Sequence, residues 1–173
     1  MNYHNITYPD QNNGDGLRVV LWVSGCEHHC QGCQNPQTWG VNTGIEFDKN
    51  AKIEIYEQLS KEYISGITFS GGDPLHENNL RELYELITDI KIQYPEKTLW
   101  LYTGYTWEQI WDIDNKSPEY NLRRNIIKLC NVIVDGEYVE NLKDTSLHWR
   151  GSSNQRVIDV KKSIKKHNIV LWD

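Results

Sequence analysis

The fold is decided by a stretch near the N-terminus, which reads Arg18-Val19-Val20-Leu21-Trp22-Val23-Ser24-Gly25-Cys26-Glu27-His28-His29-Cys30-Gln31-Gly32-Cys33. Its first six residues form an apolar run of the kind that a buried strand gives. Gly25 ends this strand and Gly32 lets the chain turn back, so the thiols are predicted to lie on a loop at the strand's carboxyl end. Spacings of three and then two residues allow the three thiols to converge on one centre.

The length and composition predict one domain over residues 1–173. A chain of 173 residues can bury a substantial core, since chains of this size remove roughly 70% of their unfolded surface from water. The net charge of −6 is far too small for a charge-disordered chain. This acidic balance also gives no electrostatic reason to expect nucleic-acid binding.

Neither a membrane span nor an export signal is expected. The mean hydropathy is −0.67, and no stretch approaches the roughly 18 apolar residues that a spanning helix needs. The first six residues lack the basic-then-apolar layout of a signal peptide. We therefore expect a cytoplasmic protein with no membrane partner.

The cysteines favour a metal site. Three lie within residues 26–33, and the fourth is Cys130. A reducing cytosol disfavours a disulfide framework, and bridges between close neighbours on a tight loop would have poor geometry. Soft sulfur ligands suit zinc or an iron–sulfur cluster, and the ligand type alone does not decide between them.

Zinc is the simpler interpretation of these thiols. A structural zinc site takes four ligands, and His28 or His29 could supply the fourth. Zinc sites usually combine two Cys-x2-Cys hooks, or one hook with a distant histidine pair, and this chain has no second hook. Three cysteines would instead leave one iron of a four-iron cluster without a protein ligand, as a cluster needs in order to bind a small molecule.

After the cysteines, strands and helices are predicted to alternate. Apolar spacing predicts helices over residues 53–63, 80–94 and 119–129. Besides the strand at 18–23, short strands are expected at residues 66–69, 98–102 and 131–134. Strands separated by helices imply parallel βαβ units.

The chain is too short for a closed barrel of such units. A full eight-unit barrel takes about 250 residues, or about 31 per unit, so this chain holds about five or six units. The predicted fold class is α/β, a partial, open (β/α) barrel of about five or six parallel strands. In such folds the chemistry lies at the carboxyl ends of the strands.

The motif Cys-x3-Cys-x2-Cys after the first strand resembles the signature of the radical S-adenosylmethionine enzymes. Gly32 stands where many of those enzymes have an aromatic residue. That departure, together with residues 35–39, 68–74 and 149–156, is similar to the small activating enzymes of anaerobic ribonucleotide reductases. The resemblance extends over about residues 1–160, nearly the whole chain.

This resemblance implies an oxidoreductase whose 4Fe-4S cluster is held by Cys26, Cys30 and Cys33, with the open iron binding S-adenosyl-L-methionine. One electron from a low-potential donor such as a flavodoxin would cleave that cofactor to methionine and a 5′-deoxyadenosyl radical. The radical would take a hydrogen from a glycine in the large subunit of anaerobic ribonucleoside-triphosphate reductase, leaving a glycyl radical there. An open, partial barrel of the radical S-adenosylmethionine type would admit this macromolecular substrate.

Several further residues are expected beside the cofactor. Gly71 and Gly72 would let the backbone approach a ligand closely, and their carbonyl groups would accept from the cofactor's amino group. Asp73 stands where many relatives have Glu and keeps the charge. For Asp135, a solvated Asp-Gly turn is an alternative to a cofactor contact. The resemblance implies further cofactor contacts from Gly32, Cys33, Gln34, Thr103 and Asp135.

The remaining features have simpler interpretations. His28 and His29 are interpreted as loop residues near the cluster rather than ligands, and Cys130 as a buried free thiol. Lysines at residues 161–166 predict a solvated helix face, and residues 151–156 offer hydrogen-bonding groups for a cofactor or partner. Two rival functions stay open: an activase of another glycyl-radical enzyme and a zinc-binding interaction module.

Overall fold

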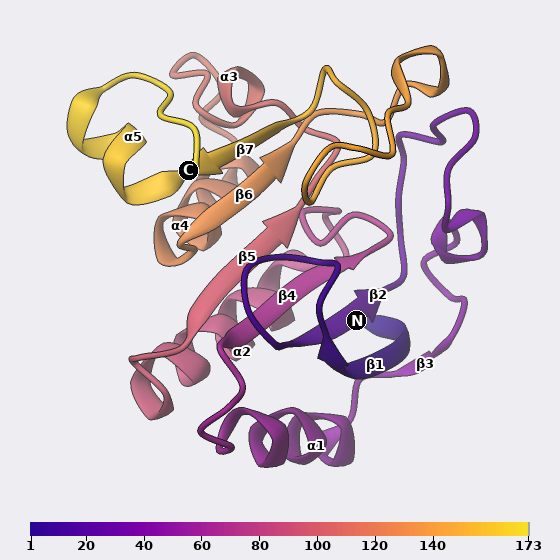
Figure 1. Ribbon diagram of the computed structural model, residues 1–173, viewed down its shortest axis with the longest axis vertical. Coiled ribbons are helices and arrows are strands. Elements are labelled where there is room, and N and C mark those ends of the chain that lie inside the picture. Colours follow the sequence, from indigo (N-terminus) through magenta and orange to yellow (C-terminus); the bar gives the residue numbers. More distant parts are fainter. Residues whose placement is uncertain (173) are drawn as a thin grey trace.

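A seven-stranded sheet runs through residues 1–172, the part of the chain that this computed structural model describes (Figure 1). Its strands are β1 (Asn2–Asp10), β2 (Arg18–Val23), β3 (Ile45–Glu46), β4 (Gly66–Gly71), β5 (Thr98–Tyr102), β6 (Val132–Asp135) and β7 (Arg156–Asp159). They lie in the order β3-β1-β2-β4-β5-β6-β7, so β3 and β7 form the two edges and the sheet is not closed.

Within residues 1–172, four strands of the sheet are parallel, and the expected number of five or six is wrong. Strands β2, β4, β5 and β6 pair in parallel, whereas β1, β3 and β7 pair antiparallel with their neighbours. The difference arises because only the parallel strands are joined by helical crossovers. An antiparallel strand needs no crossover, so β1 and β7 extend the sheet without adding βαβ units. The α/β class and the open sheet are confirmed.

Helices cover one face of this sheet. The long ones are α1 (Lys49–Leu59), α2 (Leu80–Gln93) and α4 (Pro118–Leu129), and the short ones are α3 (Trp107–Ile110), α5 (Val160–Lys166), η1 (Pro36–Thr38) and η2 (Glu140–Leu142). The expected helices at 80–94 and 119–129 are confirmed to within one residue. Helix α1 begins four residues earlier than expected because the Asp48 side chain accepts the Ala51 N–H and caps it. None of the helices in residues 1–172 is long and apolar enough to span a membrane.

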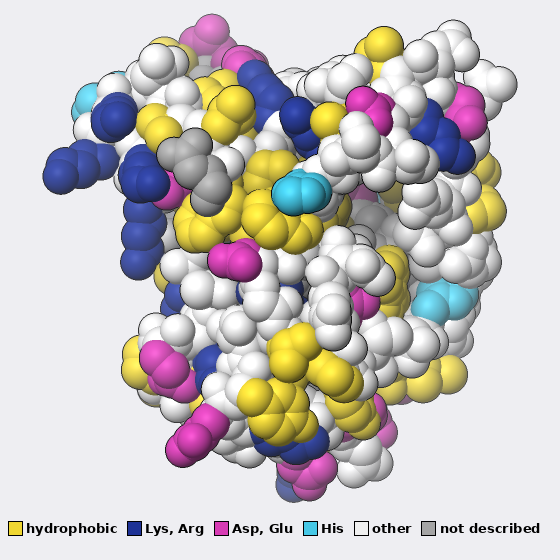
Figure 2. Space-filling model, viewed as in Figure 1, with side chains coloured by type: hydrophobic (Ala, Val, Ile, Leu, Met, Phe, Trp, Pro, Cys, Tyr) yellow, Lys and Arg dark blue, Asp and Glu magenta, His cyan; other side chains and the backbone are white. Residues whose placement is uncertain are grey.

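The two faces of the sheet carry different cores. In β5, Leu99 and Leu101 belong to the large core beneath α1, α2 and α4, whereas Trp100 belongs to a smaller cluster on the other face with Trp149 and Trp172 packed against it. This alternation follows from the two-residue period of a strand. Figure 2 shows hydrophobic side chains gathered over the middle of this second face, which loops rather than the long helices border.

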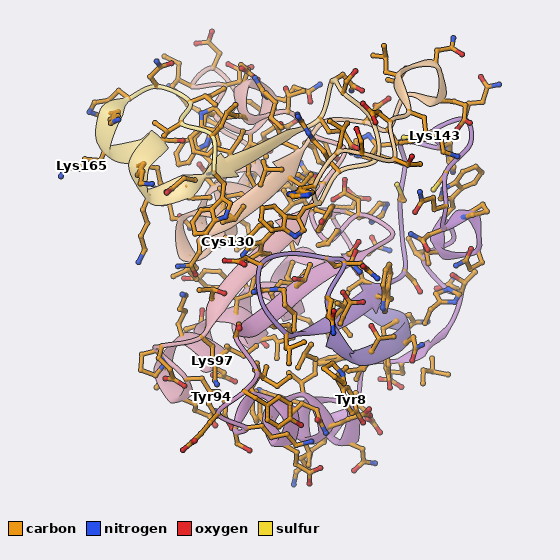
Figure 3. All side chains as sticks on the ribbon, in the orientation of Figure 1. Tyr8, Tyr94, Lys97, Cys130, Lys143 and Lys165 are labelled. Atoms are coloured by element: carbon orange, nitrogen blue, oxygen red, sulfur yellow. The ribbon has the colours of Figure 1, made fainter. Side chains whose placement is uncertain are left out.

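All four parallel strands have their carboxyl ends on the same side of the sheet. We call this row of strand ends the carboxyl edge, and the opposite row of strand starts the amino edge. The segments that follow the four strands begin at Ser24, Gly72, Thr103 and Gly136. Cys130 lies just before β6 and therefore at the opposite, amino edge, on the left of Figure 3, while Lys143 lies near the carboxyl edge. The motifs separated by up to about a hundred residues in the sequence are thus brought together at one edge.

Candidate active site

A cavity of about 200 Å³ opens at this carboxyl edge. The cysteine loop forms one wall, and the segments after β4, β5 and β6 form the others. Among the predicted site residues, it brings together Cys26, Cys30, Cys33, Gln34, Gly71, Gly72, Asp73 and Thr103. Gly32 and Asp135 lie outside its lining.

The three cysteines of the loop are half-buried. Burial raises the pKa of the Cys26 thiol to about 11 and also raises the pKa of Cys30. The backbone N–H of Asn35 donates to the sulfur of Cys33 at 3.3 Å. Among residues 1–172, no three His, Cys, Asp or Glu side chains already stand in the geometry that would hold a metal ion. The thiols share a cavity, and their protons must leave when a metal binds.

Gly32 occupies a sharp turn of the cysteine loop. Its φ of +75° is in the left-handed region, which favours glycine. A Cβ at this position would lie 2.1 Å from a carboxylate oxygen of Glu140. The left-handed backbone therefore favours glycine at this position, and a larger side chain would also require the Glu140 side chain to move.

The glycine pair Gly71-Gly72, at the end of β4, packs against the start of the cysteine loop. A Cβ on Gly72 would lie 2.5 Å from the carbonyl oxygen of Gly25, and one on Gly71 would lie 2.8 Å from that of Val23. The N–H of Asp73 donates to the Gly25 carbonyl at 2.7 Å. The backbone at this pair lies close to the segment that leads into the thiols, whereas the expected close approach to a ligand stays a prediction.

Asp73 joins three segments at the carboxyl edge. Its side chain is 2% exposed, and its Oδ2 lies 2.7 Å from Nε2 of His28. The same oxygen accepts from the Thr103 hydroxyl and the Gly104 N–H, both at 3.0 Å, while Oδ1 accepts from the Leu75 N–H at 2.8 Å. The carboxylate thus ties the cysteine loop to the ends of β4 and β5.

His28 lies between two carboxylates. Its Nδ1 is 3.1 Å from Oε1 of Glu137, opposite the contact of Nε2 with Asp73. Burial lowers the pKa of the imidazole, but the hydrogen bonds and charges of Asp73 and Glu137 outweigh burial and raise the pKa above 6.5. Because an imidazolium donates from both nitrogens, the protonated ring can bond both carboxylates. This residue, expected only to lie near the cluster, links the cysteine loop to β4 and β6.

A second set of contacts connects helix α4 to the cysteine loop. The Tyr105 hydroxyl donates to Glu27 and accepts from Arg123 at 3.0 Å. Arg123 also donates to the Leu75 carbonyl at 2.9 Å. Sequence reasoning missed Glu27, Tyr105 and Arg123, because no local pattern marks partners that lie 18 and 78 residues apart.

Asp135 is part of a buried ion pair. It is 1% exposed and accepts from Arg156 at 3.0 and 2.5 Å and from the Trp107 N–H at 2.7 Å. The alternative of a solvated turn at Asp135 is therefore wrong. Its carboxylate fixes β7 and α3 to the end of β6, and the structure does not bring it into the thiol cavity.

The structure also places the other residues that the sequence singled out. Gly151 and Gln155 line the cavity, whereas the ring of His29 packs against Trp39, with 4.8 Å between the centroids. Cys130 is confirmed as a buried free thiol, and burial raises its pKa to about 12. The lysines of α5 are exposed, as expected.

Comparison with known proteins defines the class first. Residues 12–158 match the model of a 4Fe-4S single cluster domain, so the chain is an iron–sulfur protein, and the thiols at the carboxyl edge have the chemistry that such a cluster requires. This match favours iron–sulfur over the zinc alternative.

The relatives then define the family. Two of them are anaerobic ribonucleoside-triphosphate reductase-activating proteins, one from Enterobacteria phage T4 at 42% identity, covering 97% of this chain and 100% of the relative, and one from Escherichia coli (strain K12) at 44% identity, covering 91% and 97%. A relative of the same name from Vibrio cholerae is 36% identical over 90% of this chain and 96% of its own length. The chain belongs to the family of anaerobic ribonucleoside-triphosphate reductase-activating proteins.

Proposed function

We propose that this protein activates an anaerobic ribonucleoside-triphosphate reductase by generating a glycyl radical on its large subunit. The observation that carries the proposal is the cavity at the carboxyl edge, which brings Cys26, Cys30 and Cys33 beside Gly71 and Gly72 at the end of β4. Family membership supports the same reaction, because the relatives carry this activity in their names. Residues 1–173 then form one domain of the radical S-adenosylmethionine type, a partial barrel built on the open sheet.

The residues present fit the implied cofactors. Cys26, Cys30 and Cys33 would hold a 4Fe-4S cluster, and three protein ligands would leave one iron for S-adenosylmethionine. Ser70, Gly71 and Gly72 line the cavity at the end of β4, and the carbonyl groups of Gly71 and Gly72 would accept from the amino group of that cofactor. When bound, the reduced cluster supplies the electron that cleaves S-adenosylmethionine to the radical that takes the hydrogen from glycine.

The chain's own residues place these groups. Asp73 and His28 hold the cysteine loop against the strand ends through contacts of 2.7 to 3.1 Å, so hydrogen bonds within the chain place the loop that carries the thiols. Four hydrogen-bond partners already surround the Asp73 carboxylate. Asp73 therefore acts mainly as a positioning residue, and the backbone carbonyls are the better acceptors for the cofactor's amino group.

A low-potential donor such as a flavodoxin would supply the electron. It would approach the exposed side of the cysteine loop, where Gln31, Gly32 and Gln34 are exposed. The basic helix α5 offers no docking surface for such a donor near the cluster, because β7 leads it to the amino edge beside Val132.

The test mixes this protein anaerobically with S-adenosylmethionine, a strong reductant and the large subunit of the reductase, and records the electron paramagnetic resonance spectrum. We expect a doublet, from coupling to the remaining α-hydrogen, only when all components are present. The Cys26→Ala variant is the matched control and should give no signal. Cofactor cleavage without an organic radical on the reductase would contradict the proposal and favour an activase of another glycyl-radical enzyme.

A further inference from the structure

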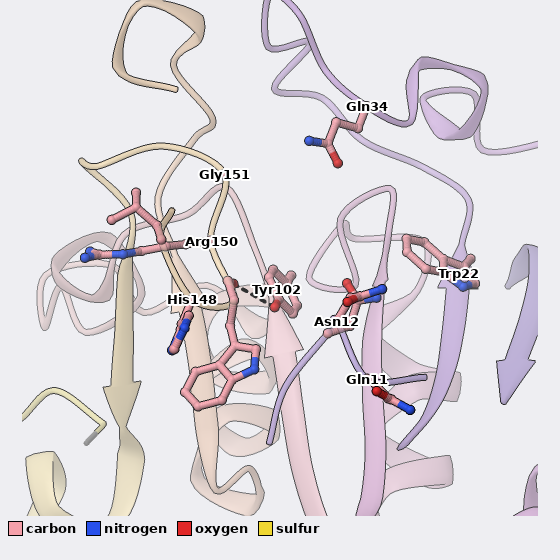
Figure 4. Close-up of a pocket in the computed structure, with 11 residues that line it drawn as sticks. Gln11, Asn12, Trp22, Gln34, Tyr102, His148, Arg150 and Gly151 are labelled. Carbon is pink, nitrogen blue, oxygen red and sulfur yellow. Dashed lines mark hydrogen bonds between the residues drawn. The ribbon is translucent and has the colours of Figure 1, made fainter. Parts of the chain in front are cut away.

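A second, larger cavity opens beside the thiol cavity. Its volume is about 590 Å³, and it lies between the segment after β1 and the segment 147–151 (Figure 4). The two cavities adjoin, since they share the lining residues Asn13, Trp22, Gln34, Tyr102 and Gly151. A chain lying in the larger cavity therefore lies beside the cavity that the thiols line.

Carboxamides and aromatic rings dominate the lining of this larger cavity, which we call the amide groove. Gln11, Asn12 and Gln34 are exposed, and Figure 4 shows Gln34 across the opening from the other two. Trp22, Tyr102 and Trp149 supply the aromatic walls. Among the described residues, neither a carboxylate nor a lysine lines the groove, and Nη1 of its arginine, Arg150, already donates to the Gln155 carbonyl at 2.5 Å.

The far wall of the groove is held in a strained conformation. Trp149 has a φ of +59°, which is rare for a bulky side chain and occurs mainly at functional sites. Its carbonyl accepts from the Tyr102 hydroxyl at 2.7 Å, the contact drawn in Figure 4, and its ring packs on Trp100 with 5.1 Å between the centroids. Tyr102 lines both cavities, so this bond fixes the wall at the point where they meet.

We propose that the amide groove binds an extended, uncharged segment of the reductase through its backbone and leads the target glycine to the thiol cavity. A carboxamide carries one acceptor and two donors, which match the C=O and N–H of a peptide backbone. A cationic side chain would lose water without gaining a carboxylate partner among the described lining residues, and a phosphate would meet a single arginine, Arg150, that already donates one hydrogen bond within the chain. This inference rests on the proposed function and adds the residues that recognise the protein substrate.

The first test removes two carboxamides that do not line the thiol cavity. In the double variant Gln11→Ala/Asn12→Ala we expect the Kd for the large subunit to rise about tenfold, since each lost hydrogen bond contributes about 0.5–1.5 kcal/mol. The iron content should stay unchanged. Cleavage of S-adenosylmethionine in the absence of the reductase, with dithionite as the electron donor, should also stay unchanged. Gln93→Ala, which removes an exposed amide at the end of α2, is the matched control and should leave the Kd unchanged.

The second test locates the bound segment. With p-benzoylphenylalanine in place of His148, which lines the groove and is exposed, photo-crosslinking should capture the segment of the reductase that carries the target glycine. The same group in place of Ile92, which is 74% exposed on α2, should give no crosslink to that segment. An unchanged Kd in the double variant, or crosslinks only to other segments, would overturn the proposal that the amide groove binds the reductase. A glycyl radical formed by the wild type would still support the proposed function in that case. Absence of that radical in the wild type would instead overturn the proposed function.

Discussion

Two buried charged side chains, Arg18 and Asp73, lie at opposite edges of the same sheet. Arg18, at the amino edge, is fully buried, and its five N–H groups donate to the carbonyls of Asp15, Ile67 and Thr98 and to the hydroxyls of Thr68 and Thr98. Burial lowers its pKa to about 10. Every partner is a neutral oxygen from the loop before β2 or from β4 and β5.

Asp73, at the carboxyl edge, is buried almost as deeply but has a different kind of partner. Its contacts with His28 and Gly104 reach into loops that border a cavity. Arg18 closes the amino edge and stiffens the sheet, whereas Asp73 arranges the segments that carry thiols. What separates these two buried charges is that the partners of Asp73 lie in segments beside the thiols, whereas the partners of Arg18 lie at the opposite ends of the strands.

The largest expected effect is loss of the iron–sulfur cluster, which should follow from removal of a thiol at the carboxyl edge but not of the thiol at the amino edge. Cys26→Ala, Cys30→Ala and Cys33→Ala should each abolish the visible absorption of the iron–sulfur cluster and cofactor cleavage. Cys130→Ala, at the amino edge, should keep both and lower the free energy of unfolding by about 1 kcal/mol. Iron analysis and absorption spectra of anaerobically reconstituted protein decide the matter, and loss of the cluster in the Cys130 variant would overturn the ligand assignment.

The next effect tests whether Arg18 is purely structural. Arg18→Met should lower the free energy of unfolding by about 3–5 kcal/mol, because it leaves several buried neutral oxygens without a donor and each costs about 1–3 kcal/mol. Urea unfolding of the metal-free chain measures this loss. The fraction that stays folded should bind iron as the wild type does, and a reduced iron content per folded molecule would show that the amino edge contributes to the site.

Asp73→Asn should act on the site more than on stability. Replacing the charged acceptor weakens the contact with His28 and loosens the cysteine loop, so we expect iron affinity to fall about ten- to hundredfold, as for other side chains that orient metal ligands. Competition with a chelator measures the affinity. Asp159→Asn is the matched control, since Asp159 is buried at the amino edge and caps α5, and equal loss in the two variants would contradict a specific role for Asp73.

The smallest effect concerns the basic helix α5. Lys161→Ala/Lys165→Ala should change the free energy of unfolding by less than about 0.5 kcal/mol and leave the rate of reduction by a protein donor unchanged, because both lysines lie at the amino edge. Stopped-flow reduction of the cluster by a flavodoxin measures that rate. A clear slowing would place donor docking on α5, away from the cysteine loop.

Local patterns in the sequence determined several parts of this protein correctly. The strand at 98–102 and the helix beginning at Leu80 follow from apolar periods that are properties of neighbouring residues. The sequence around the three cysteines after β2 was sufficient to place the thiols on one loop at the carboxyl edge, because a short loop holds its residues close whatever surrounds it. The α/β class likewise follows from alternation along the chain.

Tertiary structure alone decided what joins distant segments. Strands β1, β3 and β7 were missed because an antiparallel strand is defined by its partner, and β7 pairs with β6 across a loop of about twenty residues. The burial of Asp135 depends on Arg156, 21 residues away, and the amide groove exists only because the segments after β1 and before β7 come to face each other. Such contacts leave no local pattern, since the free energy that forms them comes from packing between residues that are remote in sequence.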